Sequence, residues 1–239
     1  MTAAPITLAG TRLLADPSGA LMLVEARTLV VSDLHLEKGS ALAASGAGSL
    51  PPYDSRATLE RLDAVLRRWQ PRAVVCLGDS FHDADGPARL GAAERGRLGR
   101  MVAAHDWIWL LGNHDPALPE ALGGRTLGEL AVGRLVLRHD VVAGRGAAGG
   151  EVIGHYHPKA GVRVRGRFVS GRCFATDGRR LVMPAFGAYA GGLDVQDPAI
   201  ARLLGPNFGV FLLARERLFA FRRDQLSVPP PDPFRARAS

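Results

Sequence analysis

The sequence predicts an α/β protein in which two β-sheets pack together with helices outside them. In the first half, short apolar runs alternate with segments of helical spacing, which indicates a parallel sheet with right-handed crossovers. In the second half, short strands follow one another without intervening helices, which indicates a second, mixed sheet. With 239 residues and 47% hydrophobic residues, the chain can bury one sizeable core. We therefore expect residues 1–227 to form a single domain and residues 228–239, which contain three consecutive prolines, to form a flexible tail.

The elements of the first half follow from periodicity and turn residues. An Asp-Pro-Ser-Gly turn separates two short alternating runs and predicts a strand pair. Continuous aliphatic runs predict three strands that are buried on both faces. Asp54 or Ser55 can cap a helix that Pro71 ends, and Pro87 can begin another. The expected elements are strands 11–15, 20–24, 29–31, 73–77 and 107–111, helices 54–70 and 87–104, and a mobile loop of small residues over 41–49.

The second half contains short runs of β-branched and aliphatic residues. They predict strands 134–137, 151–153, 161–169, 173–175, 180–183, 210–213 and 218–221. The segment 143–150 is rich in glycine and alanine, so we expect it to be flexible.

Five of the predicted strands end in residue types that bind metals. In open α/β sheets, ligands collect at the carboxyl ends of the strands. The residues at these ends are Asp33 and His35, Asp79, Asn113, His139, and His155 and His157. Their recurrence favours one shared site over five separate strand-end turns.

This donor set combines three oxygen donors with four imidazoles. It is too large for one tetrahedral zinc ion but suits two ions of five or six coordination. Two ions ~4 Å apart require a bridging carboxylate, and mixed oxygen and nitrogen donors suit manganese, iron, zinc or cobalt better than calcium. Such a pair can clamp a phosphate and activate water, so the sequence predicts phosphoester hydrolysis.

The same motifs resemble those of the calcineurin-like metallophosphoesterase superfamily. They are Asp33-x-His35, Gly78-Asp79, the run from Gly112 to Asp115, His139, and Gly154-His155-x-His157. The resemblance implies a four-layer α-β-β-α sandwich of two mixed sheets flanked by helices.

The resemblance also implies the role of each residue. One metal would be held by Asp33, His35, Asp79 and His157. The other would be held by Asp79, Asn113, His139 and His155, so that Asp79 bridges the two ions. His114 matches the superfamily histidine that contacts the phosphate and protonates the leaving group, which makes His114 and Asp79 the expected catalytic residues.

Longer motifs narrow the resemblance. The segments DLHLEKG (33–39), LPPYDSRATL (50–59), GDSFHD (78–83), GHYHP (154–158) and MPAFGAYAGGLDV (183–195) are similar to the bacterial ligase-associated DNA damage response endonuclease family. This similarity implies a manganese-dependent phosphodiesterase that acts on DNA in repair, in functional association with a DNA ligase and a helicase.

Other features bear on the substrate. The net charge is +7, and all basic residues except Lys38 and Lys159 are arginine. Arginine side chains suit the binding of phosphate groups, which favours a polyanionic partner. The alternative is that the excess positive charge only solvates the surface. His82 either contacts substrate, orients a ligand, or lies on a surface loop. Arg163 and Arg165, with Arg167 and Arg172, either guide DNA along one strand face or are simply solvated.

The sequence is compatible with three functions. The first is a DNA endonuclease, the second a phosphodiesterase or phosphatase for a small nucleotide or diester, and the third a non-catalytic scaffold, against which the intact donor set argues. No apolar run approaches the ~20 residues of a membrane helix. Because Cys76 and Cys173 are expected to be reduced, we expect a cytoplasmic protein. The sequence does not predict its oligomeric state.

Overall fold

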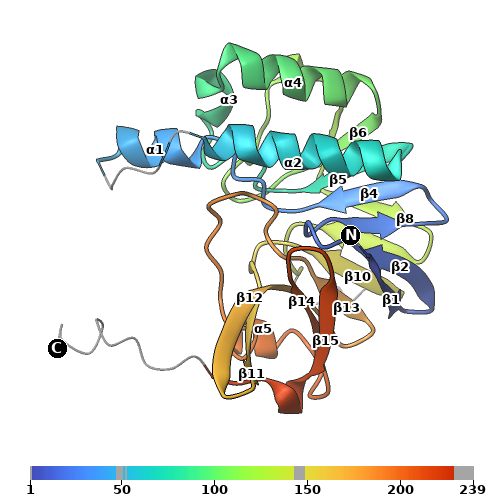
Figure 1. The fold of residues 1–239 in the computed structure, drawn as a ribbon. Helices are drawn as coiled ribbons and strands as arrows, with labels where there is room; N and C mark the ends of the chain where they lie inside the picture. The colour runs from blue at the N-terminus through green and yellow to red at the C-terminus, as the bar shows by residue number, and fades with distance from the viewer. Residues whose placement is uncertain (1, 47–50, 52, 143–148, 229–239) are drawn as a thin grey trace.

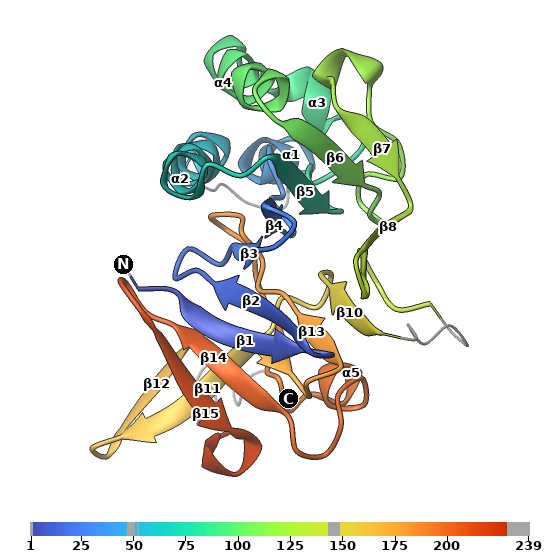
Figure 2. The same ribbon diagram turned by 90° about the vertical axis from the view of Figure 1, so that its right-hand side faces the viewer.

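The computed structural model describes residues 2–46, 51, 53–142 and 149–228. They form two mixed β-sheets that pack face to face, with helices outside (Figures 1 and 2). The predicted α/β fold class is therefore confirmed.

The first sheet has the strand order β1-β2-β3-β4-β5-β6-β7. Its first four strands are antiparallel, and β4 to β7 are parallel. The strands are β1 (Ala4–Leu8), β2 (Thr11–Ala15), β3 (Leu21–Leu23), β4 (Thr28–Val31), β5 (Ala73–Leu77), β6 (Asp106–Leu110) and β7 (Arg125–Leu127).

The second sheet has the order β15-β14-β12-β13-β10-β9-β8, with β11 paired to β12. Strands β9, β10 and β13 are parallel and the other pairs are antiparallel. The strands are β8 (Glu129–Val132), β9 (Leu135–Arg138), β10 (Gly150–Ile153), β11 (Lys159–Val164), β12 (Arg167–Thr176), β13 (Arg180–Val182), β14 (Gly209–Leu213) and β15 (Leu218–Arg222).

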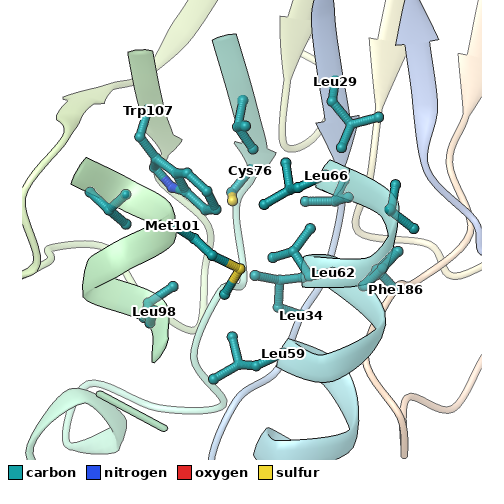
Figure 3. Packing of buried hydrophobic residues seen from close by; sticks show 14 of the residues in the cluster. Leu29, Leu34, Leu59, Leu62, Leu66, Cys76, Leu98, Met101, Trp107 and Phe186 are labelled. Carbon is teal, nitrogen blue, oxygen red and sulfur yellow. The ribbon is translucent and has the colours of Figure 1, made fainter. Parts of the chain in front are cut away.

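Helices cover the outer face of the first sheet (Figure 1). The long helix α2 (Asp54–Trp69) presents a leucine-rich stripe, and α4 (Ala92–Ala103) packs beside it. Figure 3 shows Leu59, Leu62 and Leu66 of α2 against the strand residues Cys76 and Trp107. The shorter helices on this side are α1 (Lys38–Ala44), α3 (Gly86–Arg89) and η1 (Glu120–Leu122).

The outer face of the second sheet carries a thinner layer. Helix α5 (Pro198–Ala201) and its flanking segment pack Val195, Ile200, Leu204 and Phe208 onto the sheet. The 3-10 helix η2 (Arg223–Gln225) follows β15. Between the sheets lies a third apolar cluster, which includes Val30 and Val75 from one sheet and Leu137 and Val152 from the other. No described helix is both long and apolar enough to cross a membrane.

Several element boundaries differ from the sequence prediction. Residues 41–44, expected in a loop, belong to α1, and residues 47–49 lie outside the described part of the chain. The expected helix 87–104 is two helices, because Leu90 turns into the core with an extended backbone. The expected strand 161–169 is a hairpin that turns at Arg165 and Gly166, both with positive φ.

Further strands were not expected, namely β1, β7 and β8. Most of the predicted flexible segment 143–150 and residues 229–239 of the predicted tail fall outside the described residues, whereas Gly150 lies in β10.

Candidate metal centre

The donor residues lie where strands of both sheets end. Strands β4, β5 and β6 are parallel neighbours, so the loops after them leave the first sheet at one edge. Strands β9 and β10 are parallel in the second sheet and supply His139 and the 154–157 loop. The backbone N–H of His155 donates to Asp33 Oδ2 at 3.1 Å and thereby joins the loops of the two sheets.

One group of donors consists of Asp33, His35 and His157. His157 Nε2 lies 3.2 Å from Asp33 Oδ1 and 3.3 Å from His35 Nε2. Asp33 is fully buried and His35 is 6% exposed, so both are shielded from solvent. These atoms form a compact set of one oxygen and two nitrogens.

A second group consists of Asp79, Asn113, His139 and His155. His139 Nε2 lies 3.0 Å from Asn113 Oδ1, 3.2 Å from His155 Nδ1 and 3.4 Å from Asp79 Oδ1. His139 Nδ1 lies 2.7 Å from the Leu77 carbonyl. That carbonyl can only accept a hydrogen bond, so it keeps the proton on Nδ1 and leaves the Nε2 lone pair facing the other donors.

Asp79 lies between the two groups. Its Oδ1 faces His139, whereas its Oδ2 lies 3.8 Å from His35 Nε2. The side chain is 3% exposed. One carboxylate therefore faces both donor sets, which is the position that a bridging ligand requires.

Burial and neighbouring charges set the protonation states of the first group. Burial lowers the pKa of His35 to about 3, so its imidazole is neutral and able to bind a cation. Burial opposes ionisation of Asp33, but His157, His139 and the Ser32 hydroxyl outweigh it and lower the pKa of Asp33. The site thus presents a carboxylate and a neutral imidazole, the forms that bind metals.

The spacing, protonation and charge of these residues suit a pair of divalent ions. Two donors bound to one first-row ion at ~2.1 Å lie roughly 3–4 Å apart, as the atoms of each group do. Neutral imidazole nitrogens whose lone pairs face each other repel, so the two close histidine pairs need a proton or a cation between them. Two buried carboxylates supply the charge that favours cations. The donor set fits, and the assignment of each ligand remains a prediction.

The backbone is strained where these donors occur. Asp33, His35, Asp79, His155 and His157 all have φ between 42° and 66°. Each such non-glycine residue costs roughly 1–2 kcal/mol. Such strain concentrates at functional sites because the surrounding structure holds it there.

Glycines make room for the donors. A Cβ at Gly112 would overlap Oδ1 and the backbone nitrogen of Asp79, and one at Gly154 would overlap the Ser32 hydroxyl beside Asp33. The glycines of the Gly112-Asn113 and Gly154-His155 pairs therefore allow loops from different strands to approach closely.

His114 lies at the open side of the centre. Its side chain is 40% exposed, and its Nε2 lies 4.0 Å from Asp79 Oδ2. Its Nδ1 lies 2.7 Å from the carbonyl of His82, which fixes the ring orientation. The His82 ring stacks on His114 with a centroid distance of 5.3 Å and faces His35 at 5.5 Å. His82 thus lies within the site, in position either to contact substrate or to orient His114.

Asp115 was not singled out from the sequence, although it ends the Gly112–Asp115 run. Its buried carboxylate accepts backbone N–H groups of Asp79 at 2.9 Å, Ser80 at 2.6 Å and Gly112 at 3.1 Å. Burial raises the pKa of Asp115 to about 6. Asp115 ties the loop that carries Asp79 to the loop that carries Asn113, and so positions both donors.

The predicted arginine strip does not exist as one strand face. Arg163 lies in β11, Arg165 in the turn and Arg167 at the start of β12, because the chain reverses at residues 165–166. Arg163 and Arg165 are exposed, and among the described residues they form no hydrogen bond or ion pair with the donor residues. Arg172 lies further along β12 and is partly buried. Their contact with substrate remains a prediction.

Comparisons with known proteins agree with this architecture. A family model described as calcineurin-like phosphoesterase matches residues 26–165, which include every donor residue. The solved structure of the nuclease MPE of Pseudomonas putida is similar, with a TM-score of 0.70 and 22% identity over 92% of this chain and 100% of that chain. Yfce, a phosphoesterase from E. coli, has a TM-score of 0.43 and 14% identity over 81% of this chain and 97% of that chain. The sequence has no significant match among curated proteins.

Proposed function

The chain belongs to the calcineurin-like phosphoesterase family and is a metal-dependent phosphoesterase, and we propose that it cleaves phosphodiester bonds in DNA. The observation that carries the two-metal part of this proposal is the position of Asp79. Its two oxygens face separate groups of histidines, at 3.4 Å and 3.8 Å.

The residues that would hold the ions are those of the two donor groups. Asp33, His35 and His157 would hold one ion, Asn113, His139 and His155 the other, and Asp79 would contact both. When bound, the ions would supply Lewis acidity toward the phosphate oxygens and lower the pKa of water. Manganese is the proposed metal, because the longer motifs resemble a family of manganese-dependent phosphodiesterases; the same donors would also accept iron, zinc or cobalt.

His114 is proposed to protonate the leaving oxygen of the substrate. The His82 carbonyl holds its Nδ1, so Nε2 faces the centre, and its exposure leaves room for a substrate. The acid form is the imidazolium, which carries a proton on Nε2 and can pass it to the departing sugar oxygen. His82 supports this role by stacking on the ring.

Three observations support DNA as the substrate. The chain carries a net charge of +7, and nearly all of its basic residues are arginine, which suits phosphate binding. Its longer motifs are similar to the ligase-associated endonuclease family, and the structurally similar Pseudomonas putida protein is named a nuclease. From the same resemblance we propose a role in DNA repair alongside a DNA ligase and a helicase.

The test is an assay of the protein reconstituted with manganese. Single-stranded and duplex DNA oligonucleotides, a mononucleotide and a small chromogenic diester would be incubated separately with the enzyme. Cleavage of oligonucleotides within the chain is expected, together with slower hydrolysis of the small diester. Turnover of the small diester or mononucleotide with no oligonucleotide cleavage would show that the substrate is a small nucleotide or diester and not DNA. No hydrolysis of any substrate with any of manganese, iron, zinc or cobalt would favour a non-catalytic scaffold.

A further inference from the structure

A basic pocket of about 730 Å³ includes in its lining Lys159, which follows the donor residue His157 by two positions. Helix α2, strands β11 and β12 and the turn between β14 and β15 contribute to it. Its cationic lining residues are Arg61, Arg68, Lys159, Arg172 and Arg215, and none of its described lining residues carries a carboxylate.

Two of these cations, Arg61 and Arg172, are partly buried close together, and neither pairs with a carboxylate in the described part of the chain. Arg61 donates to the Phe186 carbonyl and lies 4.5 Å over the Phe186 ring, and its buried Nε has no hydrogen-bond partner among the described residues. Arg172 Nη1 donates to the Ala185 carbonyl at 2.6 Å. Burial lowers the pKa of both groups, and the charge of Arg172 contributes to the lowering at Arg61. Burying like charges without a carboxylate is unfavourable unless an anion joins them.

The three other cationic residues of the pocket are Arg68, Lys159 and Arg215. Arg68 pairs with the buried Asp16 at 2.8 Å. The side chains of Lys159 and Arg215 form no hydrogen bond or ion pair with any residue that the structure describes. An anion in this pocket would therefore meet several cations that have no carboxylate of their own.

One segment of chain, residues 185–187, forms hydrogen bonds both with pocket arginines and with the backbone at the donor residue Asp33. The backbone N–H groups of Phe186 and Gly187 donate to the carbonyls of Ser32 and Asp33, at 2.7 Å and 3.0 Å. The carbonyls of residues 185 and 186 accept from the two pocket arginines. Lys159 follows His157 by two residues. In Figure 1 this segment runs beneath α2, between the helix layer and the second sheet.

We infer that this pocket binds a second phosphate of the DNA strand whose scissile phosphodiester lies at the metal centre. The inference rests on the proposed function and sharpens it, because a substrate that carries one phosphate cannot occupy both places. A polymer with regularly spaced phosphates can occupy both, and arginine forks match phosphate oxygens. The pocket would therefore favour oligonucleotides over small diesters.

The test compares charge-removing variants in direct binding. Lys159→Gln and Arg215→Gln remove pocket charges that hold no structural hydrogen bond. Arg61 and Arg172 are unsuitable because they hold the segment beside Asp33. Arg12→Gln is the matched control, since Arg12 is exposed at the start of β2, at the opposite edge of the sheet. Binding of a fluorescein-labelled single-stranded 20-mer would be measured by anisotropy in EDTA, where no cleavage occurs.

Each pocket variant is expected to raise the Kd of the 20-mer about fivefold at ~0.1 M salt, and to reduce the slope of log K against log salt by about 0.7. The control should change the Kd less than twofold. If the pocket variants lose no more affinity for the 20-mer than the Arg12→Gln control does, the inference is overturned.

A second measurement separates binding from disturbance of the centre. In manganese, the ratio of the oligonucleotide KM to the KM of a small chromogenic diester should rise about fivefold in each pocket variant. An equal rise in both KM values would show that the residues act on the fold, and would contradict the inference. Failure of the wild-type protein to hydrolyse either substrate would instead reject the proposed function.

Discussion

At the scale of single residues, Asp79 is the side chain on which the proposed centre depends most. It is the carboxylate that faces both histidine groups, and its φ of 47° is held by contacts from neighbouring loops. Loss of a residue that only orients a metal ligand typically costs 10–100-fold. Loss of a shared ligand should cost more.

Asp79→Ala is therefore expected to lower hydrolysis of a chromogenic phosphodiester in manganese by at least about 100-fold. Metal analysis after dialysis should show fewer than two ions per chain. Asp106→Asn is the control, because Asp106 is an exposed carboxylate that pairs with Arg125 at 3.0 Å. Full activity with two bound ions in Asp79→Ala would contradict the bridging role.

His114→Ala should have an effect that depends on the leaving group. A phosphodiester with a good leaving group, such as nitrophenolate, needs little proton transfer, whereas a sugar alkoxide needs the acid. Activity on oligonucleotides should therefore fall about 100-fold, and activity on the nitrophenyl diester no more than about tenfold. The measurement is the fall in kcat/KM of His114→Ala on each of the two substrates. Equal falls on both substrates would contradict the role of His114 as the acid.

The clustering of the proposed donors could be expected from the sequence, because each lies shortly after a short apolar run that forms a strand. The residues that support them could not be predicted. Asp115 follows three residues that already resemble a functional motif, and only the structure shows that it accepts N–H groups from two loops. The meeting of Arg61 with Arg172 depends on how α2 packs near β12, which no local pattern in the sequence encodes.

At the scale of elements, a buried ionic network connects β9 and β10, the strands that immediately precede His139 and the 154–157 loop. Glu151 of β10 lies 3.0 Å from Arg138 of β9 and 2.6 Å from Arg180 of β13. The side chains of Glu151 and Arg138 are 4% and 5% exposed. A buried charge that loses its partner is strongly destabilising.

Glu151→Gln is expected to reduce the free energy of unfolding by about 3 kcal/mol, because it leaves two arginines without their shared carboxylate. Urea denaturation followed by circular dichroism measures this change. Glu129→Gln is the matched control, since Glu129 is 47% exposed and lies 3.6 Å from the same Arg138. The control should cost less than about 1 kcal/mol. Equal losses in the free energy of unfolding for the two variants would show that burial of the network contributes nothing to stability.

The success of sequence prediction also varied by element, for physical reasons. Strands β4, β5 and β6 are covered on both faces, so their apolar runs are continuous and easily recognised. The sequence predicts one strand where the β11–β12 hairpin occurs, because the alternation of valine and arginine continues up to the turn at Arg165. Helix α1 is short and built from small residues, and its packing against α2 and α3 supports it more than its own composition.

At the scale of the whole molecule, the two sheets share one apolar cluster. Cys76 lies in the cluster between α2 and the first sheet, and Cys173 lies in the cluster outside the second sheet. They are 1% and 0% exposed, and burial raises the pKa of both thiols. The thiolate is the reactive form, so neither cysteine should react in the native state.

These two thiols report on opposite ends of the fold, and they test whether residues 1–227 unfold as one domain. Because the shared cluster lies between the sheets, loss of either sheet would expose apolar surface of the other, and we expect a single cooperative transition. Pulsed labelling with a thiol reagent across a urea series at pH 8, with the two sites separated by mass spectrometry of peptides, should give the same midpoint for Cys76 and Cys173. Cys76→Ser and Cys173→Ser, each labelled alone, control for cross-reaction. Separate midpoints would show that the sheets unfold independently, and the metal centre would then join two units rather than lie within one.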